Sequence, residues 1–334
     1  MNVSFFAGID ISKNSLDVAV RDERSLLFHI SIENNKEGLK QFVEQCQSSG
    51  VSLERCLFCC EHTGIYSQVL LSFVNRHNVA LWMESSVRIR RSMGLHRGKS
   101  DKIDAIRISD YAHRYADQAV IWQPERETLM RLKELVVLRK RFLVTKNTIK
   151  VPLKEAALFQ EKKLCSELSK LSQKPIEALE KQISEVETRI RALIRKDDRL
   201  AHLFEIVTSV DGVGEVVFWE MVISTNEFKH FSCPRKFACY AGVAPFEHSS
   251  GTSVRGKTRV SHLANKRMKR LLHMAAMSAI TAKGELADYY QRKVAQGKAK
   301  MAVLNAIRNK IIHRIFACLR DDRKYEKNYI HALA

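Results

Sequence analysis

Val3-Ser4-Phe5-Phe6-Ala7-Gly8-Ile9-Asp10, near the start of the chain, is a short apolar run that ends in a carboxylate. Two further runs, Ser15–Val20 and Leu26–Ile32, follow it after short polar stretches. This spacing predicts three strands joined by tight turns. A carboxylate at the end of an apolar strand lies at the surface of the sheet. We therefore expect Asp10 to meet residues of another strand there.

The next part of the chain alternates between helix and strand patterns. Lys36–Cys46 and Ile65–Asn75 carry apolar residues at helical spacing, whereas Arg55–Cys60 and Val79–Met83 are short apolar strands. Three antiparallel strands followed by alternating helices and strands predict an α/β domain with a mixed sheet over residues 1–122.

Helical patterns take over after Trp122-Gln123-Pro124. Residues 125–200 predict long helices, and one apolar stripe steps alternately by 3 and 4 residues through Ile176, Leu179, Ile183, Val186, Ile190 and Leu193. Such a heptad seam is buried either in a helical hairpin within one chain or in a coiled coil between chains. We expect the coiled coil, because a projecting pair of helices needs a partner for its apolar stripe.

Residues 201–334 predict a mainly helical third segment. Its first part, residues 205–224, places Gly212 and Gly214 between apolar helices and resembles a helix-hairpin-helix, whose backbone amides can hold a phosphate. A plain packing corner between two helices is the alternative. The remaining elements predicted here are a short helix, a hydroxyl-rich loop, a basic helix and a last helical region: Arg235–Ala241, His248–Ser253, His262–Ala282 and Glu285–Arg320.

Composition narrows the partners of the chain. Among 334 residues, 56 Lys and Arg stand against 37 Asp and Glu, which gives a net charge of +19. This excess favours a polyanion, and nucleic acid is the expected one. No apolar run is long enough for a membrane span, no basic-then-apolar leader begins the chain, and the cysteines lack zinc-site spacing. We therefore expect a cytoplasmic protein with no membrane partner.

Positive charge is concentrated between Gly251 and Gly284, a stretch without a single acid. Bound phosphates would relieve the repulsion among these side chains. The candidate nucleic-acid-binding residues, together with the two glycines named above, are Arg255, Lys257, Arg259, Lys266, Arg267, Lys269 and Arg270.

Four carboxylates form the candidate catalytic centre. Asp10 and Glu61 each end an apolar strand, and Asp101 and Asp104 stand at positions i and i+3, on one face of a predicted helix. Each acid alone has an ordinary explanation as a turn, cap or surface residue. Converging carboxylates instead repel one another by roughly 4 kcal/mol per pair at close range, so they shift their pKa values or bind cations. All-oxygen ligands suit Mg²⁺ or Mn²⁺, which assist phosphoryl transfer.

Two sets of motifs resemble one known family. Gly8-Ile9-Asp10, Glu61-His62-Thr63-Gly64 and Asp101-Lys102-Ile103-Asp104-Ala105, with the order of strands and helices, resemble the RNase-H-like (RuvC-like) domain of the DEDD transposases of bacterial insertion sequences. Pilin-gene invertases and bridge-RNA-guided recombinases are related to that family. Tyr240–Pro245, Ser250-Gly251 and Ser253–Gly256 with Arg259 are similar to its second domain. Ser261-His262-Leu263-Ala264 departs from the Ser-Lys-x-Gly that members often carry.

The resemblance implies a mechanism beyond the acids. The four carboxylates would bind divalent metal, and Ser250 would attack DNA to form a phosphoserine link, meeting the metal over one scissile phosphate. The residues alone leave the attacking hydroxyl open among Ser249, Ser250, Thr252 and Ser253. The family also implies double-stranded DNA as substrate, a structured noncoding guide RNA and a homo-oligomer, either dimer or tetramer.

We therefore expect a nuclease domain at 1–122, a coiled-coil dimerisation segment at 125–200 and a serine-bearing transposase domain at 201–334. The expected activity is transposition of an insertion sequence. Three alternatives remain open: a site-specific invertase with the same chemistry, a junction nuclease that uses water while Ser250 is structural, and a non-catalytic DNA-binding protein.

Overall fold

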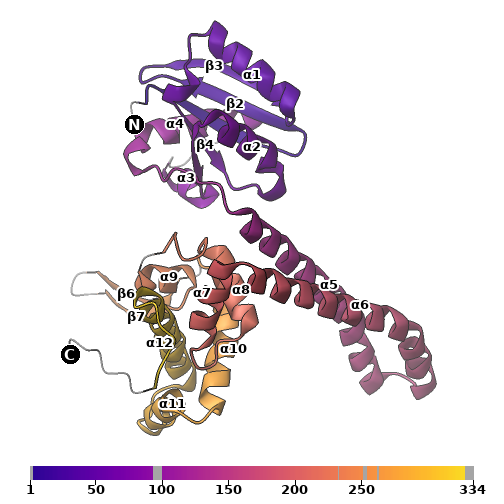
Figure 1. Ribbon diagram of the computed structural model, residues 1–334. Helices are drawn as coiled ribbons and strands as arrows, with labels where there is room; N and C mark the ends of the chain where they lie inside the picture. Colours follow the sequence, from indigo (N-terminus) through magenta and orange to yellow (C-terminus); the bar gives the residue numbers. More distant parts are fainter. Residues whose placement is uncertain (1–2, 93–99, 232, 251–253, 262, 328–334) are drawn as a thin grey trace. The chain divides into compact units, whose positions relative to one another are not determined.

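The computed structural model describes residues 3–92, 100–231, 233–250, 254–261 and 263–327 (Figure 1). The chain divides into two compact units, Met1–Pro124 (unit 1) and Glu125–Ala334 (unit 2). Unit 1 is built on a sheet, whereas unit 2 consists almost entirely of helices. The assignment of residues 1–122, 125–200 and 201–334 to a nuclease domain, a dimerisation segment and a transposase domain stays a prediction.

Unit 1 contains a five-stranded mixed sheet in the order β3-β2-β1-β4-β5. The first three strands are antiparallel neighbours, and β1, β4 and β5 run parallel. This confirms the mixed α/β sheet predicted from the sequence. The strands are β1 (Phe5–Ile11), β2 (Ser15–Arg21), β3 (Leu26–Glu33), β4 (Cys56–Glu61) and β5 (Ala80–Glu84).

Helices cover both faces of this sheet. One face packs on α1 (Lys36–Ser48) and α2 (Gln68–His77), through strand residues such as Ile9 and Phe58. The other face packs on α3 (Ser86–Ser92) and α4 (Asp101–Arg114). Because side chains alternate along a strand, the residues of β1 that face α4 are its even-numbered ones.

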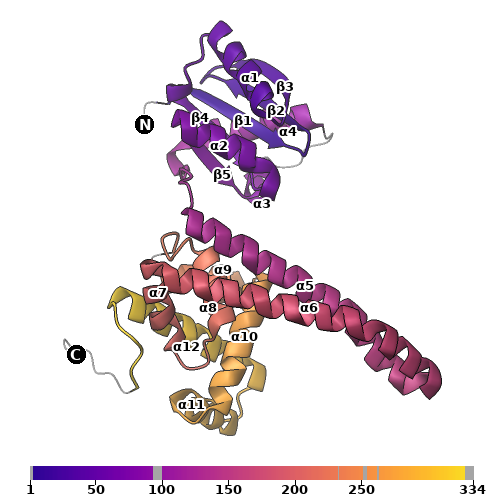
Figure 2. The same cartoon turned by 45° about the vertical axis from the view of Figure 1, so that its right-hand side comes forward.

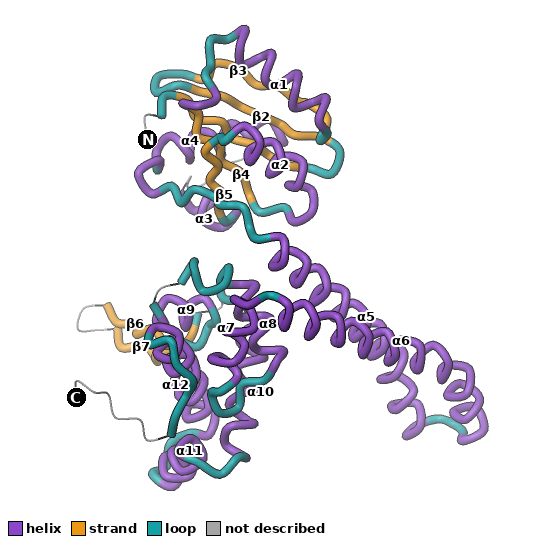
Figure 3. Tube along the Cα trace, in the orientation of Figure 1, coloured by secondary structure: helices purple, strands orange, loops and turns teal. Residues whose placement is uncertain are grey.

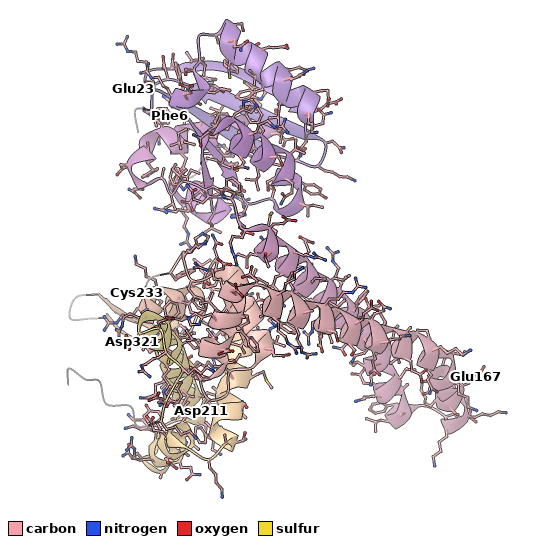
Figure 4. All side chains as sticks on the ribbon, in the orientation of Figure 1. Phe6, Glu23, Glu167, Asp211, Cys233 and Asp321 are labelled. Atoms are coloured by element: carbon pink, nitrogen blue, oxygen red, sulfur yellow. The ribbon has the colours of Figure 1, made fainter. Side chains whose placement is uncertain are left out.

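Unit 2 begins with a long helical hairpin. Helices α5 (Glu127–Phe159) and α6 (Lys162–Lys196) run side by side, as Figure 2 shows, and each continues through an internal proline. Figure 4 labels Glu167, which lies in the half of α6 that begins at the hairpin turn.

The apolar seam of α6 is buried within its own chain. Ile183, Val186 and Ile190 are buried, and the last two belong to one core with Leu129 and Leu132 of α5. These residues therefore pack in a helical hairpin, one of the two arrangements that the pattern allowed, whereas pairing of this segment between two chains stays a prediction. A two-residue connection keeps the partner helix close, so pairing within the chain costs little loop-closure entropy.

The rest of unit 2 packs around the same core. It contains α7 (Asp198–Thr208), α8 (Glu215–Ser224), α9 (Pro234–Tyr240), α10 (Lys266–Thr281), α11 (Glu285–Ala295) and α12 (Lys300–Arg320). The expected last helix is therefore two helices, α11 and α12, and the basic helix starts at Lys266, after its N-cap Asn265.

A two-stranded hairpin replaces the predicted hydroxyl-rich loop. Strands β6 (Pro245–Ser250) and β7 (Val254–Val260) pair antiparallel, and they are the orange segment among the helices in Figure 3. Their sequences, PFEHSS and VRGKTRV, lack an apolar alternation, so the pattern did not predict strands. Within the described residues, no helix has the length and apolar character required to cross a membrane.

Replacing Ile190 with Lys tests where the seam of α6 faces. Ile190 is 0% exposed in the core of unit 2, so we expect Ile190→Lys to lower the free energy of unfolding by about 3–5 kcal/mol. Urea unfolding followed by circular dichroism measures this loss. The control, Leu171→Lys, changes a residue of α6 that is 71% exposed and should leave stability within about 0.5 kcal/mol. A changed mass by light scattering with unchanged stability of Ile190→Lys would contradict the intrachain seam.

Candidate active site

Two of the four predicted acids lie at the same end of neighbouring parallel strands. The register of the parallel strands β1 and β4 pairs Ile9 with Cys60. Asp10 and Glu61 are the next residues of these two strands, so they lie at the same strand end. Both side chains are half-buried. The apolar residues before them pack in the core of unit 1, and each carboxylate follows at the end of its apolar run.

The other two acids open helix α4. Ser100 is the N-cap of the helix, and its hydroxyl accepts a hydrogen bond from the backbone N–H of Ile103 at 3.3 Å. Asp101 and Asp104 then occupy the first turn, where the positive end of the helix dipole stabilises negative charge. The predicted start of this helix is thus confirmed, and its cap fixes the place of both acids.

Gly8 allows α4 to lie directly on β1. A Cβ atom at this position would overlap the backbone of Ala105 and Ser109, so only glycine permits so close an approach. Along the rest of the helix, Asp110 pairs with Arg21 of β2, and His113 meets the ring of Phe6 edge-on at 4.9 Å. These contacts bring the first turn of α4 to the strand end that carries Asp10.

The other three acids act electrostatically on Asp10. Burial, as the largest cause, and then the negative charges of Asp101, Asp104 and Glu61 together raise the pKa of Asp10 to about 6. A smaller contribution comes from Asp17. Three of the acids that the sequence singled out are therefore near enough to raise the pKa of the fourth, Asp10, and their joint role at one site stays a prediction.

Asp17 is an acid that sequence reasoning missed. It pairs with Asp10 across β1 and β2, and it is buried. Both of its oxygens are held by β3: His29 Nε2 lies 2.9 Å from one, and Ser31 donates to the other at 3.2 Å. The apolar alternation of Ser15–Val20 contained the signal, since Asp17 falls at one of its polar positions.

A further strand-end acid is already satisfied by its neighbours. Glu84 ends β5 and is paired with Glu61 of β4 in the register. It accepts hydrogen bonds from the backbone N–H of Ser85 at 2.7 Å, from Arg88 at 3.0 Å and from the Tyr111 hydroxyl at 3.3 Å. Burial, followed by the charge of Glu84, raises the pKa of Tyr111 to about 12. Glu84 is therefore a structural carboxylate.

The donor set at Asp10 fits a hard divalent cation. Four carboxylates supply only oxygen ligands, and burial together with neighbouring negative charges raises the pKa of Asp10. Among the described residues, no three His, Cys, Asp or Glu side chains already stand at positions that could hold a metal ion. Asp104 also makes an ion pair with Arg107 at 3.1 Å. Binding a cation would thus require side-chain rotations. Carboxylate oxygens are ligands that Mg²⁺ and Mn²⁺ prefer, so a bound cation would stabilise the rotated side chains.

The second group of predicted residues lies in unit 2. Ser250 ends β6, opposite Val254 in the register of the hairpin. The side chains of Ser250, Arg255 and Lys257 lie outside the described part of the structure, as do residues 251–253.

The basic residues of α10 differ from one another in their surroundings. Lys266 and Arg270 are exposed, as is Arg259 of β7, and Lys269 is half-buried. Arg267 forms an ion pair with Glu220 of α8 at 2.9 Å. Lys266 and Arg270 therefore present free positive charge more directly than Arg267.

The two glycines of the predicted helix-hairpin-helix have different surroundings. Gly212 adopts φ +84°, and a Cβ atom there would overlap the Ala275 carbonyl and the Ala279 side chain of α10. Gly214 is the N-cap of α8, and a Cβ atom there would meet nothing within 4 Å. Gly212 thus serves helix packing, whereas the nucleic-acid contact of Gly214 stays a prediction.

Comparison with known sequences identifies the family. Residues 7–158 match the DEDD transposases of IS110 type, and residues 204–291 match the family described as Transposase IS116/IS110/IS902. The chain belongs to the IS110/IS116 family of transposases. Family membership implies that it binds DNA and transfers phosphoryl groups of DNA.

Individual relatives cover the chain to different extents. The pilin gene-inverting protein of Moraxella bovis is 22% identical over 96% of this chain and 98% of its own length. The insertion element IS110 uncharacterized 43.6 kDa protein of Streptomyces coelicolor is 31% identical, over 45% of this chain and 36% of that protein. Among solved structures, T. thermophilus RuvC in complex with a Holliday junction substrate has a TM-score of 0.26 and 13% identity, covering 36% of this chain and 99% of that one.

Gly8→Ala tests how α4 reaches the sheet. The added methyl group would overlap the backbone of α4, so we expect the helix to shift and the free energy of unfolding to fall by about 2–3 kcal/mol. We also expect Mg²⁺ to lose its stabilising effect, because Asp101 and Asp104 move away from Asp10. The control, Gly50→Ala, places alanine at φ +68° with nothing within 4 Å, costs about 1 kcal/mol and should keep the Mg²⁺ response. A full Mg²⁺ response in Gly8→Ala would contradict this account.

Asp10→Asn tests how the negative charge of Asp10 affects protein stability, in an experiment that requires no catalysis. Since folding raises the pKa of Asp10, the folded state holds this proton more tightly than the unfolded state, and stability is lost as pH rises from about 4 through about 6. At pH 7.5 and without metal, we expect Asp10→Asn to be more stable than the wild type by about 1–2 kcal/mol, after allowance for solvent screening.

Added Mg²⁺ should reverse that order. It should raise the melting temperature of the wild type at pH 7.5, less so at pH 5.5, and leave Asp10→Asn unchanged, as differential scanning fluorimetry will measure. Glu33→Gln, an exposed acid at the end of β3, is the matched control and should respond as the wild type does. An equal Mg²⁺ response in the wild type and Asp10→Asn would exclude a cation site at Asp10.

Proposed function

We propose that this chain mobilises an insertion sequence by metal-assisted DNA cleavage and strand exchange, with Ser250 as nucleophile. In this proposal Asp10, Glu61, Asp101 and Asp104 bind the metal. The observation that supports it is the pKa of Asp10, which burial and then the negative charges of Asp101, Asp104 and Glu61 raise to about 6. Membership of a transposase family supplies DNA as the substrate.

In the absence of a cation, the negative charges of the four carboxylates repel one another. This repulsion favours the binding of a cation among them. Mg²⁺ or Mn²⁺ there would lower the pKa of an attacking hydroxyl and balance negative charge that develops on the phosphate. Glu61 and Asp10 come from strands in the sheet core, so their backbones are fixed before the ligand arrives. Asp17, held by His29 and Ser31, adds negative charge behind Asp10 without offering a free oxygen.

The serine step is a transesterification. The Ser250 oxygen forms a bond to phosphorus, one ester bond of the DNA strand breaks, and the sugar oxygen that leaves takes up a proton. Because the phosphoserine ester conserves the bond energy, a hydroxyl from another strand can attack it, release the serine and restore a phosphodiester. Strand exchange then needs no nucleotide cofactor. The step requires the Ser250 hydroxyl and the acid cluster at the same scissile phosphate.

Nucleic-acid partners follow from charge and family. Lys266, Lys269 and Arg270 of α10, with Arg255, Lys257, Arg259 and Arg267, are proposed to contact the phosphate backbone. A structured noncoding RNA is the proposed guide, so that base pairing supplies sequence specificity while the protein binds backbone shape and charge. We further propose that the protein acts in the cytoplasm as a homodimer or tetramer, through surfaces other than the buried seam of α6.

Site-specific inversion is the second candidate function. It is favoured by the similarity to the pilin gene-inverting protein of Moraxella bovis, which extends over 96% of this chain. Inversion uses the same chemistry on a fixed chromosomal segment, so the DNA beside the gene distinguishes the two. Element ends with a structured noncoding stretch favour transposition, whereas a flanking invertible segment favours inversion.

Trapping a protein–DNA adduct tests the nucleophile. With Mg²⁺ and DNA that carries an element junction, we expect the wild type to form an adduct that survives denaturing gel electrophoresis. Ser250→Ala should abolish the adduct while keeping DNA affinity within about twofold, because the attacking oxygen is removed and little else changes. Ser249→Ala is the neighbouring control and should retain the adduct. Strand cleavage that continues in Ser250→Ala would instead support hydrolysis by water, as in a junction nuclease.

A further inference from the structure

Arg308 of α12 is a buried positive charge with no acid beside it. The residue is 5% exposed. In the described part of the chain, no carboxylate oxygen lies within the 4.0 Å ion-pair distance of its guanidinium. Burial lowers the pKa of Arg308, and no acid among the described residues counteracts this effect. Buried charges in proteins are normally paired, because transferring an ion from water to the interior is unfavourable.

Neutral groups surround this guanidinium. One terminal nitrogen lies 2.7 Å from Nδ1 of His273 on α10, another lies 3.5 Å from the amide oxygen of Asn305, and the buried Nε has no hydrogen-bond partner. These contacts orient the guanidinium without neutralising it. An anion that binds here would supply the compensating negative charge that the described residues do not.

Arg308 also determines the proton position on His273. A guanidinium only donates hydrogen bonds, so Nδ1 of His273 must accept, and the ring proton then belongs to Nε2. Burial and the charge of Arg308 both lower the pKa of His273, which keeps the ring neutral. His273 is half-buried, and its Nε2–H is a donor with a positive charge behind it.

His273 continues the basic stripe of α10. Lys266, Lys269 or Arg270, and His273 follow one another at spacings of 3 and 4 residues, which places them on one flank of the helix. This flank adjoins the segment that leads into β6. The side chain of Lys269 lies beside Gly242, and Asn305 donates to the Val243 carbonyl at 2.8 Å.

We infer that His273, positioned and polarised by Arg308, binds a phosphodiester of the DNA backbone as the last contact of the α10 stripe. This inference rests on the proposed function for its choice of DNA as the anion. A phosphate oxygen accepts from Nε2 of His273, and its charge compensates Arg308 through the ring. The site stands beside the root of the β6–β7 hairpin, so the bound phosphate would fix DNA next to the strand that carries Ser250.

DNA binding measured without metal tests this site separately from the reaction. Fluorescence anisotropy with a labelled DNA duplex gives the affinity and its salt dependence. We expect Arg308→Met to weaken binding about tenfold near physiological salt and to reduce the slope of log K against log salt by about one. Arg308→Lys keeps the charge and should retain most of the affinity. Arg292→Met removes one exposed positive charge from α11 and serves as the matched control, with little effect expected.

Two readouts distinguish a binding role from a structural one. Without DNA, the melting temperature of Arg308→Met should equal or exceed that of the wild type, because an uncompensated buried charge is removed. In ¹⁵N spectra of histidine-labelled protein, assigned with His273→Gln, the Nε2 signal of His273 should shift on addition of the DNA duplex. Addition of the duplex should leave the signal of His313, the histidine of α12, unshifted.

The outcomes separate this inference from the proposed function. If the wild type fails to bind duplex DNA at all, the proposed function itself is wrong. If the wild type binds and Arg308→Met matches Arg292→Met in affinity and salt slope, only the phosphate site is wrong. A lower melting temperature of Arg308→Met in free protein, or an effect confined to a labelled RNA hairpin with DNA binding unchanged, would also overturn it.

Discussion

The contact between Gly8 and the backbone of α4 is the constraint on which the candidate active site depends. It lets a helix lie on the central strand of the sheet with no side chain between them. The N-cap at Ser100 fixes where that helix begins, and the Arg21–Asp110 ion pair fixes its other part. With the helix placed in this way, its first-turn acids can reach only one strand end, that of β1.

Charge partners separate the acids of unit 1 into two classes. Asp17 and Glu84 are buried, and each has its oxygens held by neighbouring side chains, His29 and Ser31 in one case and Arg88 and Tyr111 in the other. Asp10 instead has its pKa raised to about 6 by burial and by other carboxylates. Asp17 and Glu84 therefore support the structure of the sheet, whereas Asp10 has an environment that disfavours its charged form.

The sequence indicated where the candidate acids stand in the fold, but not which residues surround them. Asp10 and Glu61 could be found because apolar strands end at them, and Asp101 and Asp104 because of their helical spacing. Asp17 could not, since its place opposite Asp10 depends on the register of two strands, which only the folded sheet defines.

The same limit applies to the long helices and to the hairpin. Ile183 and Ile190 show a seam whichever helix covers it, so the pattern cannot tell a neighbour in the chain from a second chain. Strands β6 and β7 were not predicted because their residues are mostly polar, and their pairing is a backbone register that the residue pattern does not reveal.

Unit 2 holds its buried charges in two contrasting ways. Glu227 has a fully buried side chain, and Arg126, Arg199 and Lys229 approach it at 2.5, 3.1 and 3.4 Å. Arg308 is also buried, and its hydrogen-bond partners among the described residues are His273 and Asn305, which are neutral acceptors. In a chain of net charge +19, acidic residues are fewer than basic ones. Even so, substitution of one residue near Arg308 by Asp would give it an acidic partner. A buried cation left without such an acid is costly for the free protein and favourable once a phosphate is bound, which is the balance that a DNA-binding surface requires.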